Sequence, residues 1–295
     1  MLSPLSTRCG HCHFLEDVLK QMHTSLPTAI RAQVAQAVSI IEHHLQDSLV
    51  AIHLFGSALH GGLKPSSDID LLVVVEEQLR DDIRGPLLTE LLTASAPPGA
   101  DEAVRPLEVT IVARNSITPW RHPVRRELQF GEWLRDDIEA GRFEGSIADP
   151  DLTILLSKAL QHGISLVGHE PSEIFDPIPT PDVMQALLDT AAQWNVPEDW
   201  AGEETNIVLA LARMWFTAAT GAIASKDDAA HWLIERLPQE HRMVVLSAAV
   251  AYRGEAHDRL ADQPAELAAF IHYARDAVVR MVGDRAVQAA ADLRS

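Results

Sequence analysis

The sequence has no long uninterrupted apolar run. None of its stretches approaches the ~20 residues that a helix needs to cross the hydrocarbon core of a bilayer. The N-terminus also lacks the succession of basic, apolar and small residues that forms a secretory signal peptide. We therefore expect a cytoplasmic protein that has no association with membranes.

Cysteine is scarce, and both copies fall in the short segment Cys9-Gly10-His11-Cys12-His13. The spacing matches c-type haem attachment, and a zinc site is also conceivable. Haem attachment would require export, and a zinc site would need ligands from elsewhere in the chain, so we favour neither. We interpret residues 1–21 as an irregular N-terminal extension.

Basic residues are few compared with acidic ones. The 24 Lys and Arg against 42 Asp and Glu give a formal net charge of −18, and the basic residues are dispersed. Nucleic-acid affinity depends largely on Lys and Arg that neutralise phosphates, so this balance disfavours a duplex-binding surface. It suits metal ions or a small polycation, although an acidic surface also serves solubility alone.

The length of 295 residues favours two domains. Helical spacing predicts helices over Thr28–Gln46 and from the 80s to Ser95. Short apolar runs predict three strands, over Leu49–Phe55, Ile69–Val75 and Leu107–Val112. Strands that alternate with helices indicate an α/β layer, which we assign to residues 22–178.

Beyond about residue 150 the pattern changes to helix after helix. Leu152, Leu155, Leu156 and Ala159 form one helical face, and the proline-rich segment Phe175–Pro181 reads as a linker. Further helices are predicted over about 182–194, 203–220, 227–236, 239–253 and 264–282. The predicted fold is an α/β domain followed by an all-α helical bundle over 179–295.

The segment from Leu54 to Val73 carries the strongest chemical signal. Its strand ends in Gly56-Ser57 at what reads as the start of a helix, where free backbone N–H groups can hold a phosphate. Glycine at this point lets the backbone approach a ligand closely. A loop then leads to Ser67-Asp68-Ile69-Asp70 at the head of the next strand.

The period of a strand places Asp68 and Asp70 on one face and Ile69 on the other. Two adjacent carboxylates repel each other unless a cation lies between them, and Mg²⁺ that also carries nucleotide phosphates fits this need. A Gly-Ser pair alone is usually a turn, and Asp-x-Asp is common by chance. The ordered combination of strand, Gly-Ser and Asp-x-Asp is far more specific.

This combination resembles the nucleotidyltransferase signature of the DNA polymerase β-like superfamily, which implies a mixed-sheet domain. That superfamily requires a third carboxylate on a neighbouring strand. Glu108 fits, because Leu107 and Val109 face one way and leave Glu108 and Thr110 on the other face. A solvated strand face is the alternative interpretation of Glu108.

A narrower resemblance extends from about Met22 to Gly283. The chain is similar to the aminoglycoside (3″)(9) adenylyltransferases in five segments: Phe55–Ala58, Gly61–Pro65, Arg126–Trp133, Trp200–Gly202 and Asn206–Leu209. The resemblance implies transfer of AMP from ATP to the 3″-hydroxyl of streptomycin and the 9-hydroxyl of spectinomycin. Pyrophosphate would be released, and the modified antibiotic would be inactive, which confers resistance.

The resemblance also assigns roles to residues. It implies two Mg²⁺ ions on Asp68, Asp70 and Glu108, and it makes Glu108 the base that accepts the hydroxyl proton. The implied ATP contacts are Ser57, Ser67, Arg213, Lys226 and Tyr252. The implied antibiotic contacts are Trp133, Asp199 and Glu203, an aromatic face and carboxylates that suit guanidinium and methylammonium groups.

One residue departs from the family pattern, because Glu203 stands where an aspartate is usual. The charge is kept and the reach is one methylene longer. For Arg213, Lys226 and Tyr252, a place on a helix surface is the alternative interpretation.

Other functions remain open at this point. A nucleotidyltransferase could act on another small molecule, a protein or tRNA, and a degenerate one could serve as a non-catalytic binding module. The acidic charge disfavours tRNA, and the presence of all three carboxylates disfavours a degenerate site. We expect a monomer that binds no nucleic acid.

Overall fold

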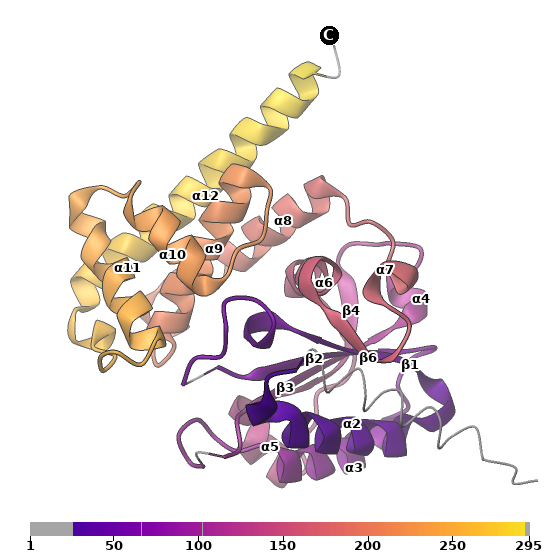
Figure 1. The fold of residues 1–295 in the computed structure, drawn as a ribbon. Coiled ribbons are helices and arrows are strands. Elements are labelled where there is room, and N and C mark those ends of the chain that lie inside the picture. Colours follow the sequence, from indigo (N-terminus) through magenta and orange to yellow (C-terminus); the bar gives the residue numbers. More distant parts are fainter. Residues whose placement is uncertain (1–25, 66, 102, 293–295) are drawn as a thin grey trace, which may run out of the picture.

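A computed structural model of the protein describes residues 26–292, apart from residues 66 and 102. The predicted extension over residues 1–21, with its Cys9–His13 segment, lies outside the described residues. Figure 1 shows a sheet flanked by helices and, beside it, a separate group of helices formed by the C-terminal part of the chain. No helix in the described part is both long enough and apolar enough to span a membrane.

The N-terminal part of the chain contains a six-stranded sheet in the order β5-β4-β3-β2-β1-β6. Only β2 and β3 pair in parallel, and the other neighbours are antiparallel. The predicted mixed sheet is therefore confirmed. The strands are β1 Leu49–Phe55, β2 Ile69–Val75, β3 Leu107–Ala113, β4 Val124–Phe130, β5 Ile147–Asp149 and β6 Ile164–Gly168.

Apolar residues on both faces of the sheet are covered by helices. On one face α2 and α3 bury side chains such as Val34 and Leu91 against Leu71. On the other face α6 and α7 bury Leu156 and neighbouring side chains against Leu72. Figure 1 shows these two layers on opposite sides of the strands.

The helices of this part are α2 Arg31–Leu45, α3 Asp81–Leu91, α4 Arg114–Ile117, α5 Arg135–Glu139, α6 Asp151–His162 and α7 Pro171–Ile174. Short 3₁₀ turns are η1 Thr28–Ile30, η2 Gln46–Ser48, η3 Gly56–Ala58, η4 Leu92–Ala94, η5 Glu132–Leu134, η6 Pro197–Asp199 and η7 Leu260–Asp262. Gly56-Ser57 therefore opens a single 3₁₀ turn where the sequence predicted the start of a short helix.

The three predicted strands are present, but the sequence pattern missed β4, β5 and β6. In β4 a register shift against β3 at Glu127 breaks the alternation, so that Val124 packs on one face of the sheet and Leu128 and Phe130 on the other. Glu127 is a buried acid whose carboxylate accepts the Leu79 N–H at 3.2 Å and lies 3.5 Å from the Arg84 guanidinium. The expectation that only helices follow residue 150 was wrong, because β6 returns to pair with the edge of β1. β6 shows no alternation, because its two buried residues, Leu166 and Val167, are adjacent.

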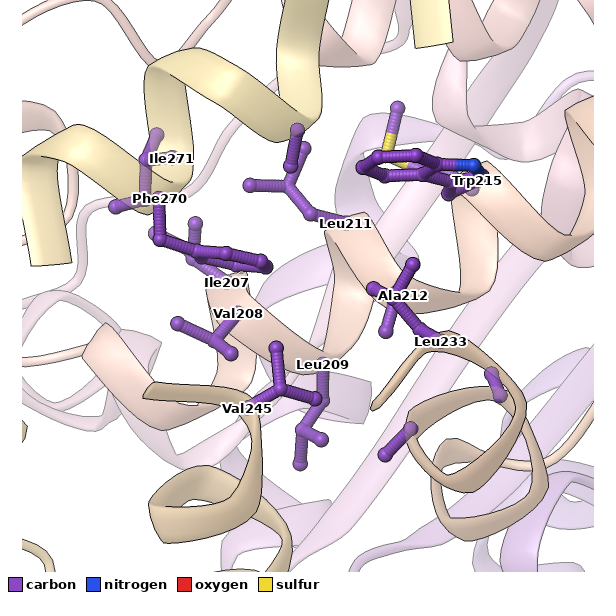
Figure 2. Packing of buried hydrophobic residues seen from close by; sticks show 14 of the residues in the cluster. Ile207, Val208, Leu209, Leu211, Ala212, Trp215, Leu233, Val245, Phe270 and Ile271 are labelled. Atoms are coloured by element: carbon purple, nitrogen blue, oxygen red, sulfur yellow. The ribbon is translucent and has the colours of Figure 1, made fainter. Parts of the chain in front are cut away.

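The C-terminal helices form a bundle around α9. They are α8 Thr180–Ala191, α9 Glu204–Thr220, α10 Lys226–Ile234, α11 Gln239–Tyr252 and α12 Pro264–Asp292. All five predicted helices are present with small shifts at their ends, except that α12 continues past Gly283. Figure 2 shows Phe270 and Ile271 of α12 packed with Val208 and Leu211 of α9 in the centre of the bundle.

Phe270→Ala should destabilise the helical bundle strongly, because the Phe270 side chain is fully buried and its loss leaves a cavity. We expect a loss of about 3–5 kcal/mol in the free energy of unfolding, measured by urea denaturation. Val279→Ala on the same helix is the control: Val279 is 52% exposed, and its change should stay within about 0.5 kcal/mol. Equal losses for both variants would contradict this assignment of the core.

Candidate active site

Parallel pairing of β2 and β3 brings the predicted carboxylates together. Asp70 and Glu108 are direct partners in the register of the two strands. Ile69 belongs to the core on the opposite face of the sheet, so Asp68, Asp70 and Glu108 share the face that α6 covers. All three carboxylates line one cleft of about 880 Å³.

Crowding and burial make these carboxylates hard to ionise together. Burial, followed by the charge of Glu108, raises the pKa of Asp68 to about 6. Burial raises the pKa of Asp70 further, with added repulsion from Glu108 and Asp68. Burial also raises the pKa of Glu108. A cation among the three groups would offset this repulsion.

The donor set fits Mg²⁺ that is shared with a nucleotide. In the described residues, no three His, Cys, Asp or Glu side chains converge tightly enough to hold an ion by themselves. Mg²⁺ commonly takes one or two carboxylates and completes its octahedron with water and phosphate oxygens. The carboxylates of Asp68, Asp70 and Glu108 are hard oxygen donors, which suits that arrangement.

The structure shows why position 56 of the Gly-Ser pair requires glycine, which the sequence did not reveal. The φ of Gly56 is +75°, and a Cβ atom built there would lie 1.9 Å from Oδ2 of Asp70. The close approach that requires glycine is thus an approach to the Asp70 carboxylate. Ser57 follows in the 3₁₀ turn η3 and lines the cleft, as predicted for a phosphate contact.

Gln129 on β4 orients Glu108. The Gln129 side-chain amide donates from Nε2 to Oε1 of Glu108 at 3.2 Å, and Thr110 Oγ1 donates to Gln129 Oε1 at 3.0 Å. Since Thr110 and Gln129 are register partners across β3 and β4, the sheet itself holds this chain of hydrogen bonds. Gln129 lies in the segment Arg126–Trp133 that carries the family resemblance, but β4 was not predicted, so its contact with Glu108 was not foreseen.

The helical bundle supplies the opposite wall of the cleft, where Arg213, Lys226 and Tyr252 lie. Burial lowers the pKa of Arg213 and of Lys226, and Arg213 lowers that of Lys226 further. Lys226 stacks over the Tyr252 ring with Nζ 5.0 Å from the ring centre. Nε of Arg213 is buried and has no hydrogen-bond partner in the described structure.

Lys158 on α6 is a cleft residue that the sequence analysis missed. Its pKa is lowered to about 7 by burial and, next, by the charge of Arg213. The chain has four lysines, and Lys64, Lys158 and Lys226 line the cleft. That scarcity is the signal that could have singled out Lys158 in the sequence.

Trp133 and Glu203 stand at another part of the same cleft. Trp133 is 60% exposed. A Cβ atom added at Gly131 would lie 2.2 Å from the nearest carbon of the Trp133 ring, so glycine at this position leaves room for the ring. The Glu203 carboxylate accepts a hydrogen bond from Asn206 Nδ2 at 2.7 Å, and Asn206 Oδ1 accepts one from Lys226 Nζ at 3.0 Å. Asn206 thereby links Glu203 to Lys226, which with Arg213 forms the positively charged wall of the cleft (the cation wall).

Asp199 does not join the other predicted residues, because it is not among the side chains that line the cleft. Its Oδ2 accepts the backbone N–H groups of Asn195 at 2.6 Å and Val196 at 2.9 Å. These bonds lower the Asp199 pKa. In this structure the carboxylate closes the turn that precedes Glu203.

Contacts between the two halves of the chain close one end of the cleft. Lys64, in the loop before β2, lies 2.8 Å from the Asp227 carboxylate of α10, and Arg253 lies 3.5 Å from the same carboxylate. Ser67 accepts the Lys64 N–H at 2.9 Å and also pairs with the Tyr252 hydroxyl. The loop that precedes the aspartates is therefore fixed to the helical bundle.

Comparison with known proteins identifies the family. Residues 35–130 match the description "Nucleotidyltransferase domain", and residues 173–277 match "Aminoglycoside adenylyltransferase, C-terminal domain". The aminoglycoside (3″) (9) adenylyltransferase of Escherichia coli is 49% identical over 262 residues, which cover 89% of this chain and 100% of that protein. The chain belongs to the aminoglycoside adenylyltransferase family.

Two further relatives of this adenylyltransferase are informative. The spectinomycin 9-adenylyltransferase of Staphylococcus aureus is 39% identical over 246 residues, which cover 83% of this chain and 94% of that protein. A crystal structure of an Enterococcus spectinomycin adenyltransferase with ATP and spectinomycin matches with a TM-score of 0.78 at 32% identity. That match covers 84% of this chain and 98% of the other.

Gly56→Ala in this adenylyltransferase should displace Asp70 and abolish Mg²⁺-dependent ATP binding, measured by calorimetric titration. The matched control is Gly62→Ala, in the same loop region with φ of +78° but with no atom within 4 Å of the added Cβ. Both variants should lose about 1–2 kcal/mol of stability from the left-handed backbone. Only Gly56→Ala should lose ATP binding, and equal ATP affinities would refute the Asp70 contact.

Proposed function

We propose that this enzyme transfers AMP from ATP to a hydroxyl group of streptomycin and of spectinomycin and releases pyrophosphate. The observation that supports it most is the register pair of Asp70 and Glu108, beside Asp68, in a cleft whose opposite wall carries Arg213 and Lys226. Carboxylates on one wall and cations on the other suit a Mg²⁺-bound triphosphate between them.

We assign Asp68, Asp70 and Glu108 as ligands of two Mg²⁺ ions. When bound, such ions stabilise the attacking and leaving oxygens of the displacement together. The contacts to ATP are proposed for Ser57, Ser67, Arg213, Lys226 and Tyr252. All five line the same cleft as the carboxylates.

Glu108 acts as the general base in this proposal. It accepts the proton of the antibiotic hydroxyl while that oxygen forms a bond to the α-phosphorus, and the bond from the α-phosphorus to the β-phosphate oxygen breaks. The hydrogen bond from Gln129 holds the Glu108 carboxylate in one orientation. Arg213 and Lys226 offset the charge of the departing pyrophosphate.

The antibiotic is proposed to bind beside Trp133 and Glu203. An exposed indole face attracts guanidinium and methylammonium groups, and a carboxylate accepts their hydrogen bonds. The relatives include an aminoglycoside (3″) (9) adenylyltransferase and a spectinomycin 9-adenylyltransferase, which supports these two substrates. We propose carboxylate contacts from Glu203, which lines the cleft, and from Asp199, whose carboxylate also holds the turn that precedes Glu203.

The remaining proposals concern organisation. We propose domains over residues 22–178 and 179–295, a monomer in solution, and no binding to nucleic acid. The net charge of −18 supports the last point.

Glu108→Gln should abolish AMP transfer and leave ATP binding measurable. General-base catalysis contributes ~10²–10⁴-fold, so turnover should fall by at least that range. The test is pyrophosphate release from ATP and Mg²⁺ with streptomycin, spectinomycin or kanamycin added separately. The wild-type enzyme should respond to the first two drugs and ignore kanamycin. A variant with wild-type turnover would remove Glu108 as the base, and a wild-type enzyme that binds ATP without turnover would leave only a binding module.

Trp133→Ala and Glu203→Ala should lower streptomycin resistance and leave spectinomycin resistance nearly unchanged. Streptomycin carries the guanidinium groups that need these partners, and a charge-assisted hydrogen bond contributes ~1.5–3 kcal/mol, equivalent to a ten- to hundredfold change in affinity. Minimal inhibitory concentrations of both drugs, in cells that express each variant, are the measurement.

Glu198→Ala provides the matched control for Glu203, because Glu198 is an exposed acid in the same segment outside the cleft lining. It should leave both resistances unchanged. Equal losses for the two drugs in the Trp133 and Glu203 variants would place those residues in folding or domain closure.

A further inference from the structure

Three cations from two different layers meet in the cleft. Arg213 and Lys226 belong to the helical bundle, whereas Lys158 belongs to α6, the helix that covers the carboxylate face of the sheet. The charge of Arg213 acts on both lysines. Like charges held together in a buried cleft are unfavourable unless an anion lies among them.

Lys158 has no direct anionic partner within the described residues. No carboxylate there lies within 4.0 Å of its ammonium group, whereas Lys64, another lysine of the cleft, pairs with Asp227 at 2.8 Å. Asp70 and Glu108 still attract Lys158 from beyond that distance, and Arg213 and Lys226 repel it. Lys158 therefore lines a cleft that also contains the carboxylates and the pair Arg213 and Lys226, and its helix α6 covers the carboxylate face of the sheet.

That position corresponds to one part of a triphosphate. The carboxylates and their metal ions would hold the α-phosphate, and Arg213 with Lys226 would hold the terminal phosphates. A group that interacts with both sets lies near the link between the α- and β-phosphates. The oxygen of that link gains negative charge as pyrophosphate departs.

We propose that Lys158 contacts the oxygen that joins the α- and β-phosphates and stabilises the charge that develops on it during transfer. This inference rests on the proposed function. As the acceptor oxygen bonds to the α-phosphorus, the electron pair of the breaking bond passes to the bridging oxygen. Lys158 keeps its proton and acts by charge and hydrogen bonding, while the acceptor's proton goes to Glu108.

A purely structural role makes a different prediction. If Lys158 only offset the charge of Asp70 and Glu108 in the fold, its removal would change stability or metal binding without regard to the leaving group. A contact at the bridging oxygen instead makes the rate more sensitive to the acidity of the leaving group once the lysine is gone. The experiment must therefore vary the leaving group.

The test measures single-turnover AMP transfer to spectinomycin with ATP and with β,γ-dihalomethylene analogues of ATP, whose departing groups differ in pKa. For Lys158→Met, we expect transfer from ATP to fall by about 10²–10³-fold, the range for loss of one oxyanion donor. Its rate should also depend more steeply on the leaving-group pKa than the wild-type rate does. Affinity for ATP, from calorimetric titration, should fall by less than the rate.

Two variants serve as controls. Lys158→Arg keeps the positive charge and should recover most of the rate with a wild-type slope. Lys64→Met removes a lysine of the same cleft that already has an ion-pair partner, so its slope should equal that of the wild-type enzyme.

The outcomes separate the two proposals. A wild-type slope in Lys158→Met, whether that variant is fast or slow, overturns the role of Lys158 and leaves the proposed function intact. A wild-type enzyme that transfers no AMP to either drug overturns the proposed function itself. If Lys158→Met fails to fold, the Lys158→Arg and Lys158→Gln slopes decide in its place, and two wild-type slopes overturn the role.

Discussion

Repulsion among three neighbouring carboxylates is the constraint on which the rest of this site depends. Parallel strands fix Asp70 beside Glu108, and the strand period adds Asp68 on the same face. Among the described residues, no Lys, Arg or His side chain lies within ion-pair distance of Asp68, Asp70 or Glu108. Positive charge acts on the carboxylates from a longer distance, from Lys158 on α6 and from Lys226 and Arg213 on the helical bundle. The space between the two sets suits a ligand that carries both metal ions and phosphates.

The sequence was informative wherever a pattern is local. The period of two placed Asp68 and Asp70 on one face, and apolar runs located β1, β2 and β3 with nearly correct ends. The pairing of Asp70 with Glu108 needed more, because no local pattern specifies that β2 and β3 are parallel and in that register. There the family resemblance supplied the third carboxylate, and the structure supplied the contact.

Residues whose role depends on tertiary contacts escaped the sequence analysis. Gln129 lies on β4, a strand whose alternation is broken by a register shift at Glu127, so its approach to Glu108 was not predicted. Lys158 lies on a correctly predicted helix, but a lone helical lysine is usually a surface residue. Asp199 has a structural contact that the sequence did not predict, because its carboxylate accepts two backbone N–H groups and closes a turn.

Lys158, Arg213 and Lys226 come from two parts of the chain that are synthesised at different times. Lys158 follows the carboxylates closely along the chain and sits on a helix packed against their own sheet, whereas Arg213 and Lys226 come later, on the bundle. Synthesis proceeds from the N-terminus, so the carboxylates and Lys158 are made before Arg213 and Lys226. For part of synthesis, Lys158 is therefore the one member of the three cations that is present with the carboxylates. The complete cleft needs residues of both α9 and α10, so it exists only after these helices have been synthesised.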